Sequence, residues 1–214
     1  MIEASLPFFT DFSLLAMQIL IITGQIFAIL NPFSVLPTYL SLTDDMEPDE
    51  RHRIVRNSSI AVLIIAVALA VGGNYILSFF QVGIPALQVG GGILLMSIAI
   101  EMLGGLPRTK TLDSREEVAI VPIATPLLVG PGTMTTIIVL SASVSILLLL
   151  ISVVIVTFLT YLLLRYSELL VRVLGNNGIR ALGRFMTIII AAFAAQLIFA
   201  GVSQWLKIWG ILPV

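Results

Sequence analysis

The chain has 214 residues, of which 58% are hydrophobic and only 11% are charged, and its formal net charge is −1 at pH 7. This composition leaves too little polar surface for a water-soluble globular domain and indicates an integral membrane protein. The near-neutral charge gives no sign of a nucleic-acid partner. Because the chain has no cysteine, it has neither disulfides nor a thiolate metal site.

Six apolar stretches are each long enough to cross a bilayer, which takes about 20 residues of helix. In chain order they are Phe12–Leu42, Ser58–Phe80, Ile84–Leu103, Val118–Ala142, Ile146–Leu164 and Phe185–Leu206. They leave almost no residues for a soluble domain. We therefore predict an all-α membrane protein that forms one membrane domain over residues 1–214.

The first stretch is interrupted at Asn31–Pro32, in the middle of its apolar run. Proline has no N–H, and its ring clashes with the carbonyl four residues earlier, so it costs a helix about 3 kcal/mol or more. The stretch is too long for one untilted span, and the part from about Ile19 to Thr43 is the predicted crossing unit. We predict a span that is broken at mid-membrane.

The fourth stretch carries a second interruption in the sequence LVGPGTMTT, residues 128–136. Pro131 lies between two glycines, and two further prolines, Pro122 and Pro126, precede it. Lipid supplies no hydrogen bonds, so freed backbone groups at membrane depth must face protein or a water-filled cavity. Spans one and four are therefore both predicted to be broken within the membrane.

Each break offers two kinds of polar group to a ligand. A half-helix that starts after a proline presents unpaired N–H groups, which attract anionic oxygens. The carbonyl four residues before each proline loses its donor and is free to face a cation or an ammonium group. Donors beside bare carbonyls suit a small zwitterion. The predicted substrate-binding residues are Ala28, Asn31, Phe33, Ser34, Leu127, Gly130, Gly132, Thr133 and Thr136, with N–H groups predicted free at Phe33, Ser34, Gly132 and Thr133.

Positive charge alternates between the two sides of the predicted spans. Ten basic residues fall on one side, namely Arg51, Arg53, Arg56, Arg108, Lys110, Arg115, Arg165, Arg172, Arg180 and Arg184, and Lys207 alone falls on the other. Cytoplasmic loops collect Lys and Arg. We expect a multi-pass protein of the cytoplasmic membrane with both termini outside.

The two halves of the chain resemble each other. The segment GIPAL from Gly83 matches GIRAL from Gly178 at an offset of 95, and Pro32 matches Pro131 at an offset of 99. The predicted repeats span about residues 12–103 and 118–206, joined by a cytoplasmic linker at 104–117. Because each repeat has three spans, the two must lie in opposite orientations. Inverted repeats of this kind are common in secondary transporters, whose binding site lies between the repeats.

Three motifs, NPFSVLPTYLSLT, GGGILLMSIAIEML and VPIATPLLVGPGTMTTIIVLS, resemble the MarC family of six-span inner membrane proteins, which includes SnatA-type transporters. The resemblance covers nearly the whole chain, and the paired Asn/Asp-Pro and Gly-Pro-Gly elements are its most specific parts. It implies ion-coupled transport of small neutral amino acids such as glycine and alanine. Relatives often carry an aspartate at the position of Asn31, so this chain lacks that charge.

Glu101 is the only acid in the six apolar cores, and the repeat alignment pairs it with Gln196. An ionisable residue at membrane depth is a candidate proton carrier or ammonium partner. Glu101 lies close to the end of its span, so a simple interfacial position is the alternative. Gln196 is interpreted as an interhelical hydrogen bond or a ligand contact. The coupling ion, a proton or sodium, stays open.

A membrane enzyme is the main competing class, and the sequence disfavours it. The spans contain no histidine, cysteine or pair of acids from which to build a nucleophile with its base or a metal site. We therefore expect no catalytic residue, metal or cofactor. An exporter or a channel for another small polar solute is the alternative to an amino acid carrier.

Overall fold

The computed structural model describes residues 6–104 and 128–211, and over these residues every regular element is a helix. The seven helices are α1 (Leu6–Leu30), α2 (Pro32–Leu42), α3 (Pro48–Phe79), α4 (Ile84–Leu103), α5 (Pro131–Ser143), α6 (Ile146–Arg165) and α7 (Ser167–Ile208). The all-α class is confirmed. The first predicted span forms two helices, α1 and α2, and they are separated at Asn31 as predicted.

Five of these helices are long and apolar enough to cross a membrane. They are α1 from Ser13 onward, α3, α4, α6 and α7. The bounds of α4 coincide with the predicted third span. Of the predicted fourth span, residues 118–127 lie outside the described part of the chain, and α5 contains most of the rest. By length and composition, the helices of the described residues therefore agree with a multi-pass helical membrane protein.

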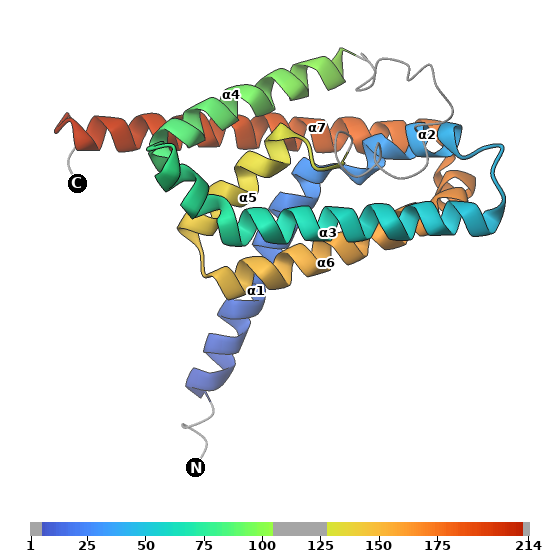
Figure 1. Cartoon of the computed structure of the whole chain (residues 1–214), viewed down its shortest axis with the longest axis horizontal. Helices are drawn as coiled ribbons and strands as arrows, with labels where there is room; N and C mark the ends of the chain where they lie inside the picture. Colours follow the sequence, from blue (N-terminus) through green and yellow to red (C-terminus); the bar gives the residue numbers. More distant parts are fainter. Residues whose placement is uncertain (1–5, 105–127, 212–214) are drawn as a thin grey trace.

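The helices are arranged as two long pairs with the broken elements between them. Helices α4 and α7 lie side by side along one edge of the molecule, and α3 and α6 lie side by side along another (Figure 1). Helix α1 crosses the bundle obliquely, and α5 contacts both α3 and α4. Helix α2 contacts α7. Every broken element is thus in contact with a long helix from the other half of the chain.

Glycines permit the close approach of α4 to α7 and α5. A Cβ on Gly92 would lie 2.8 Å from the Ala194 carbonyl oxygen, and one on Gly91 would overlap Thr135. Small residues at such positions let membrane helices come into backbone contact. Gly91 and Gly92 are thus packing positions, whereas Gly90 has open space beside it.

Two arginine-rich segments that the sequence places between spans are helical in the structure. Helix α3 starts at Pro48, ten residues before the predicted span, because proline suits the first helical position and Asp49 and Glu50 favour the positive helix start. Helix α7 starts at Ser167 and continues through a kink at Gly175. The φ of Gly175 is +68°, a conformation that glycine adopts at little cost.

Candidate functional site

The first interruption is a single residue in the left-handed conformation. Asn31 has φ 44° and ψ 61° and is fully buried. Its backbone N–H donates to the Phe27 carbonyl at 3.0 Å and so closes the last turn of α1, while Pro32 starts α2. Asparagine is one of the few residues besides glycine that tolerate this conformation. The backbone therefore changes direction at Asn31 inside the protein interior.

The Asn31 side chain reaches a helix from the other half of the chain. Its Nδ2 donates a long hydrogen bond of 3.5 Å to the Gly183 carbonyl of α7. A Cβ on Gly183 would lie 3.7 Å from the Cα of Ser34, so α7 is in contact with the start of α2. The Oδ1 atom of Asn31 is buried and has no partner among the described residues. A buried acceptor without a partner costs about 1–3 kcal/mol, which a ligand that donates a hydrogen bond would recover.

The donors that follow Asn31 are less available than the sequence predicts. The Ser34 N–H donates to the Asn31 carbonyl at 3.1 Å, and the Ser34 hydroxyl donates to the same oxygen at 2.9 Å. The prediction of a free N–H is wrong for Ser34, because the turn at Asn31 brings its carbonyl within reach of the first turn of α2. Phe33 is half-buried and packs edge to face against Phe27, with 6.0 Å between ring centroids.

The second interruption precedes α5. Gly130 is extended, with φ −79° and ψ 176°, and Pro131 occupies the first position of the helix. Met134 is the first residue after this proline whose N–H donates a backbone hydrogen bond within the described part of the chain. It donates to the Gly130 carbonyl at 3.1 Å. Gly132 and Thr133 are buried, as is Gly130 itself, whereas Pro131 is exposed. Leu127 lies outside the described residues.

Threonine hydroxyls satisfy part of the backbone at this second break. Thr133 Oγ1 donates to the Leu128 carbonyl at 3.3 Å, across the interruption, and Thr136 Oγ1 donates to the Gly132 carbonyl at 2.9 Å. Both side chains are buried. Their hydroxyl protons are occupied, but each oxygen keeps lone pairs that can accept a hydrogen bond.

The two breaks meet around one side chain of α4. Leu95 packs in a cluster with Ile29, two residues before Asn31, and a Cβ on Gly132 would lie 2.5 Å from Leu95 Cδ2. Leu30 and Val129, which directly precede Asn31 and Gly130, belong together to a larger buried cluster. Helix α1 also contacts α5 directly. Both interruptions therefore border a shared interior region beneath α4 and α7 (Figure 1).

The sequence that forms this arrangement matches a known family of membrane proteins. The family model described as MarC family integral membrane protein matches residues 16–206. The chain belongs to the MarC family. The match includes both helix breaks and most of every membrane-crossing helix, so it covers the whole candidate site.

Similar full-length proteins come from both archaea and bacteria. A UPF0056 membrane protein of Methanocaldococcus jannaschii is 35% identical over 190 residues, which cover 84% of this MarC chain and 93% of the relative. One from Pyrococcus abyssi is 32% identical over 182 residues, or 83% and 90% of the two chains. The UPF0056 inner membrane protein YhgN of Escherichia coli is 31% identical over 183 residues, or 84% and 93%. No solved structure matches the chain.

The two residues predicted to couple transport to an ion lie on the outer surface of this MarC protein. Glu101 is exposed near the end of α4, and Gln196 is exposed on α7. Neither side chain is enclosed with the helix breaks, and their coupling role stays a prediction.

The structure adds two residues to the candidate site that sequence reasoning missed, Gly183 and Leu95. Leu95 lies in the third predicted span, and Gly183 lies two residues before the sixth. Each touches the break in the other half of the chain. Gly183 directly follows the segment GIRAL, and the match of this segment to GIPAL could have drawn attention to it. Nothing in the sequence distinguishes Leu95 from other apolar residues of α4.

Proposed function

We propose that this MarC protein is a secondary transporter that carries a small zwitterionic solute, of the size of a small neutral amino acid, across the cytoplasmic membrane by alternating access. The observation that carries the proposal is the pair of buried helix breaks that border one interior region. An ordinary kink is filled by neighbouring side chains, whereas the break at Asn31 leaves a buried acceptor oxygen without a partner in the described residues.

The packing supports six spans in two inverted repeats. At the offset of 95 found in the sequence, Leu95 is equivalent to Ile190 and Ala99 is equivalent to Ala194. All four pack in one buried cluster between α4 and α7. Residues beside a two-fold axis meet their own equivalents, so this cluster lies where the axis relating two inverted repeats would run.

Each contact between the two halves has a counterpart in which the halves swap roles. Helix α2 contacts α7, and α5 contacts α4, so each half-helix after a break lies against the third span of the other repeat. In the same way, α1 contacts α6, and α3 contacts α5. A carrier whose repeats rock against each other needs contacts between the repeats at the substrate site, because the substrate then touches both repeats.

The chemistry of the breaks suits opposite ends of a zwitterion. The Asn31 oxygen would accept a hydrogen bond from an ammonium group, together with the backbone carbonyls of Ala28 and Leu127. The start of α5, with the N–H groups of Gly132 and Thr133, carries the partial positive charge that favours a carboxylate. The hydroxyl oxygens of Thr133 and Thr136 would accept further hydrogen bonds. A proton or a sodium ion would drive the transport, with Glu101 and Gln196 as the coupling candidates.

The arginine-rich end of the bundle supports an orientation. The first three turns of α3 hold Arg51, Arg53 and Arg56. The part of α7 around its kink holds Arg172, Arg180 and Arg184. By the positive-inside rule this end faces the cytoplasm. Both termini would then lie outside.

Uptake by purified protein in liposomes tests the proposal. Glycine and alanine should enter in a saturable way and exchange in counterflow under an imposed proton or sodium gradient, which a channel would not show. Thr133→Val keeps the side-chain shape but removes a buried hydroxyl, and we expect it to lower uptake about tenfold, the effect of about 1.4 kcal/mol.

The matched control is Thr157→Val on α6. Thr157 is also buried, and its hydroxyl also donates to a backbone carbonyl, in this case one of its own helix, that of Val153 at 2.8 Å. Its variant should transport within about twofold of the unmodified protein. Equal uptake by both variants, or flux without counterflow for any small amino acid, would overturn the proposal.

A further inference from the structure

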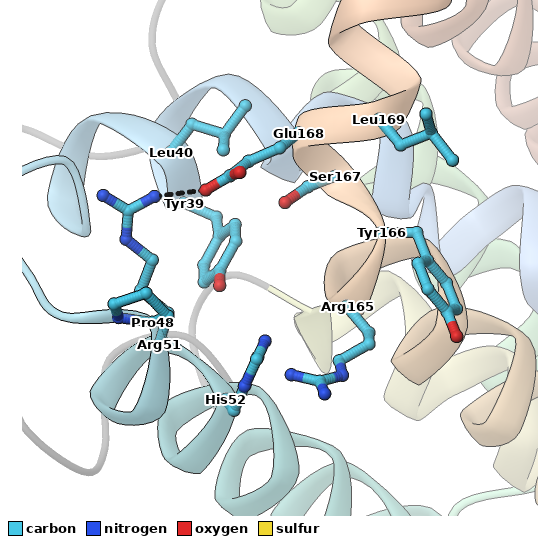
Figure 2. Close-up of a pocket in the computed structure, with 10 residues that line it drawn as sticks. All are labelled: Tyr39, Leu40, Pro48, Arg51, His52, Arg165, Tyr166, Ser167, Glu168 and Leu169. Carbon is cyan, nitrogen blue, oxygen red and sulfur yellow. Dashed lines mark hydrogen bonds and ion pairs between the residues drawn. The ribbon is translucent and has the colours of Figure 1, made fainter.

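A cavity lined by both charged and apolar residues lies at the arginine-rich end of the bundle, apart from the helix breaks. It has a volume of about 240 Å³. The residues that line it come from α2, α3 and the junction of α6 with α7, and are Tyr39, Leu40, Pro48, Arg51, His52, Arg165, Tyr166, Ser167, Glu168 and Leu169 (Figure 2). Tyr39 follows Asn31 by eight residues, or about 12 Å along a helix.

One of the two arginines in this cavity is already neutralised. Arg51 forms an ion pair with Glu168, and it also donates to the backbone carbonyls of Asp44 and Met46. Glu168 is the only acid among the lining residues. Its charge is therefore matched by Arg51 and leaves no carboxylate of the lining for Arg165.

Arg165 has a positive charge without a matching acid in the cavity lining. Its Nη1 atom is buried and has no hydrogen-bond partner among the residues that the structure describes. Figure 2 shows the Arg165 guanidinium, the His52 ring and the Tyr39 hydroxyl directed toward the same space. A buried cationic donor without a partner is costly, and an anion that accepts its hydrogen bonds would remove that cost.

We propose that this cavity binds a phosphate-type oxyanion. The planar guanidinium of Arg165 matches two oxygens of such a group. Tyr39 and His52 supply further donors at the same place, and the first turn of α7, from Ser167, contributes a partial positive charge. A water molecule occupies about 30 Å³ of liquid, so the cavity has room for one phosphate group with a few waters.

Two sources present this chemistry, a soluble phosphate and the phosphate of an anionic lipid headgroup. An oxyanion in the cavity would contact α2, α3 and the start of α7 at once. It would therefore fix the half-helix after the first break against the neighbouring helices.

Thermal unfolding of the purified full-length protein tests the site. In neutral detergent, inorganic phosphate should raise the melting temperature above that in chloride of equal ionic strength, with a saturable concentration dependence. In nanodiscs, phosphatidylglycerol should raise it above that in pure phosphatidylcholine if the source is lipid. A response in either arm supports the site and identifies the source.

Arg165→Gln should abolish the response or weaken the apparent affinity at least tenfold. Arg172→Gln is the control, because Arg172 is an exposed arginine of α7 outside the cavity. If Arg165→Gln does not fold, Tyr39→Phe decides, with an expected loss of about threefold to tenfold. No response in either arm, or equal responses from the Arg165 and Arg172 variants, would overturn the inference. So would an unchanged response in Tyr39→Phe when Arg165→Gln cannot be measured.

Discussion

The side-chain amide of Asn31 donates to the carbonyl of Gly183, a residue 152 positions later in the chain. This contact joins the first helix break to α7 and so joins the two halves of the protein at the candidate site. It also leaves the other side-chain atom of Asn31, Oδ1, buried without a partner in the described residues. The same residue therefore has a structural contact and a free acceptor.

Substitutions of Asn31 should separate the role of its side chain from that of its left-handed backbone. Asn31→Gly keeps the left-handed backbone, whereas Asn31→Ala places a Cβ in a conformation that costs about 1–2 kcal/mol. We expect both variants to lose most transport, but only the alanine variant to lose that additional stability, as measured by thermal unfolding in detergent. Normal transport by Asn31→Gly would show that the side chain has no role in the site.

Asn31→Asp tests the charge that this chain lacks at the first break. Aspartate also tolerates the left-handed conformation, so the backbone should be preserved. A buried carboxylate would bind an ammonium group more strongly but would have to stay charged at a costly position. We expect the pH dependence of uptake to change relative to the unmodified protein. An unchanged pH profile of liposome uptake would argue against a solute or ion next to residue 31.

A side chain at position 132 should require the buried Leu95 side chain of α4 to shift. A Cβ there would lie 2.5 Å from Leu95 Cδ2, so Gly132→Ala should cost about 1–3 kcal/mol of stability. Leu95→Val shortens the obstructing side chain and should recover part of that loss in the double variant. The control is Gly90→Ala, which has open space beside it and should be neutral or slightly stabilising. Additive effects of Gly132→Ala and Leu95→Val would contradict this contact.

The ion pair between Arg51 and Glu168 should contribute little to stability. The Glu168 side chain is 68% exposed, and exposed pairs are typically worth about 0–1 kcal/mol. Glu168→Gln should therefore change the unfolding midpoint only slightly, and less at high salt because salt screens the pair. It should also raise the affinity of the neighbouring cavity for phosphate, since it removes the only lining carboxylate. Weaker phosphate binding by Glu168→Gln would contradict the proposed role of charge there.

The sequence predicts the breaks well because they have a local cause. Proline at positions 32 and 131 removes an N–H whatever the surrounding structure, and both half-helices start at these prolines. The left-handed conformation of Asn31 and the hydrogen bond of Ser34 depend on the turn that the chain makes there, which the residue types alone do not specify. The helical arginine segments were missed because polar residues near a membrane surface resemble a loop when hydropathy alone is considered.

The contacts between the halves depend on tertiary packing and were only partly predictable. The offset of 95 predicts which residues of the proposed repeats are equivalent, but it does not predict that Gly183 faces Asn31 or that Leu95 lies between the breaks. The cavity around Arg165 was missed for the same reason. Its lining comes from segments that start at Tyr39, Pro48 and Arg165, and the sequence places these far apart.

Single cysteines provide the most direct test of a shared substrate site, because the chain contains no cysteine of its own. Ser34→Cys and Thr133→Cys place a thiol at each break, and Arg172→Cys places one on the exposed surface of α7, outside the candidate site, as a control. A small neutral amino acid should slow thiol labelling at both breaks with the same half-effective concentration and leave the control unchanged. Protection at neither break by any transported solute, or at only one of them, would contradict a site formed by both helix breaks.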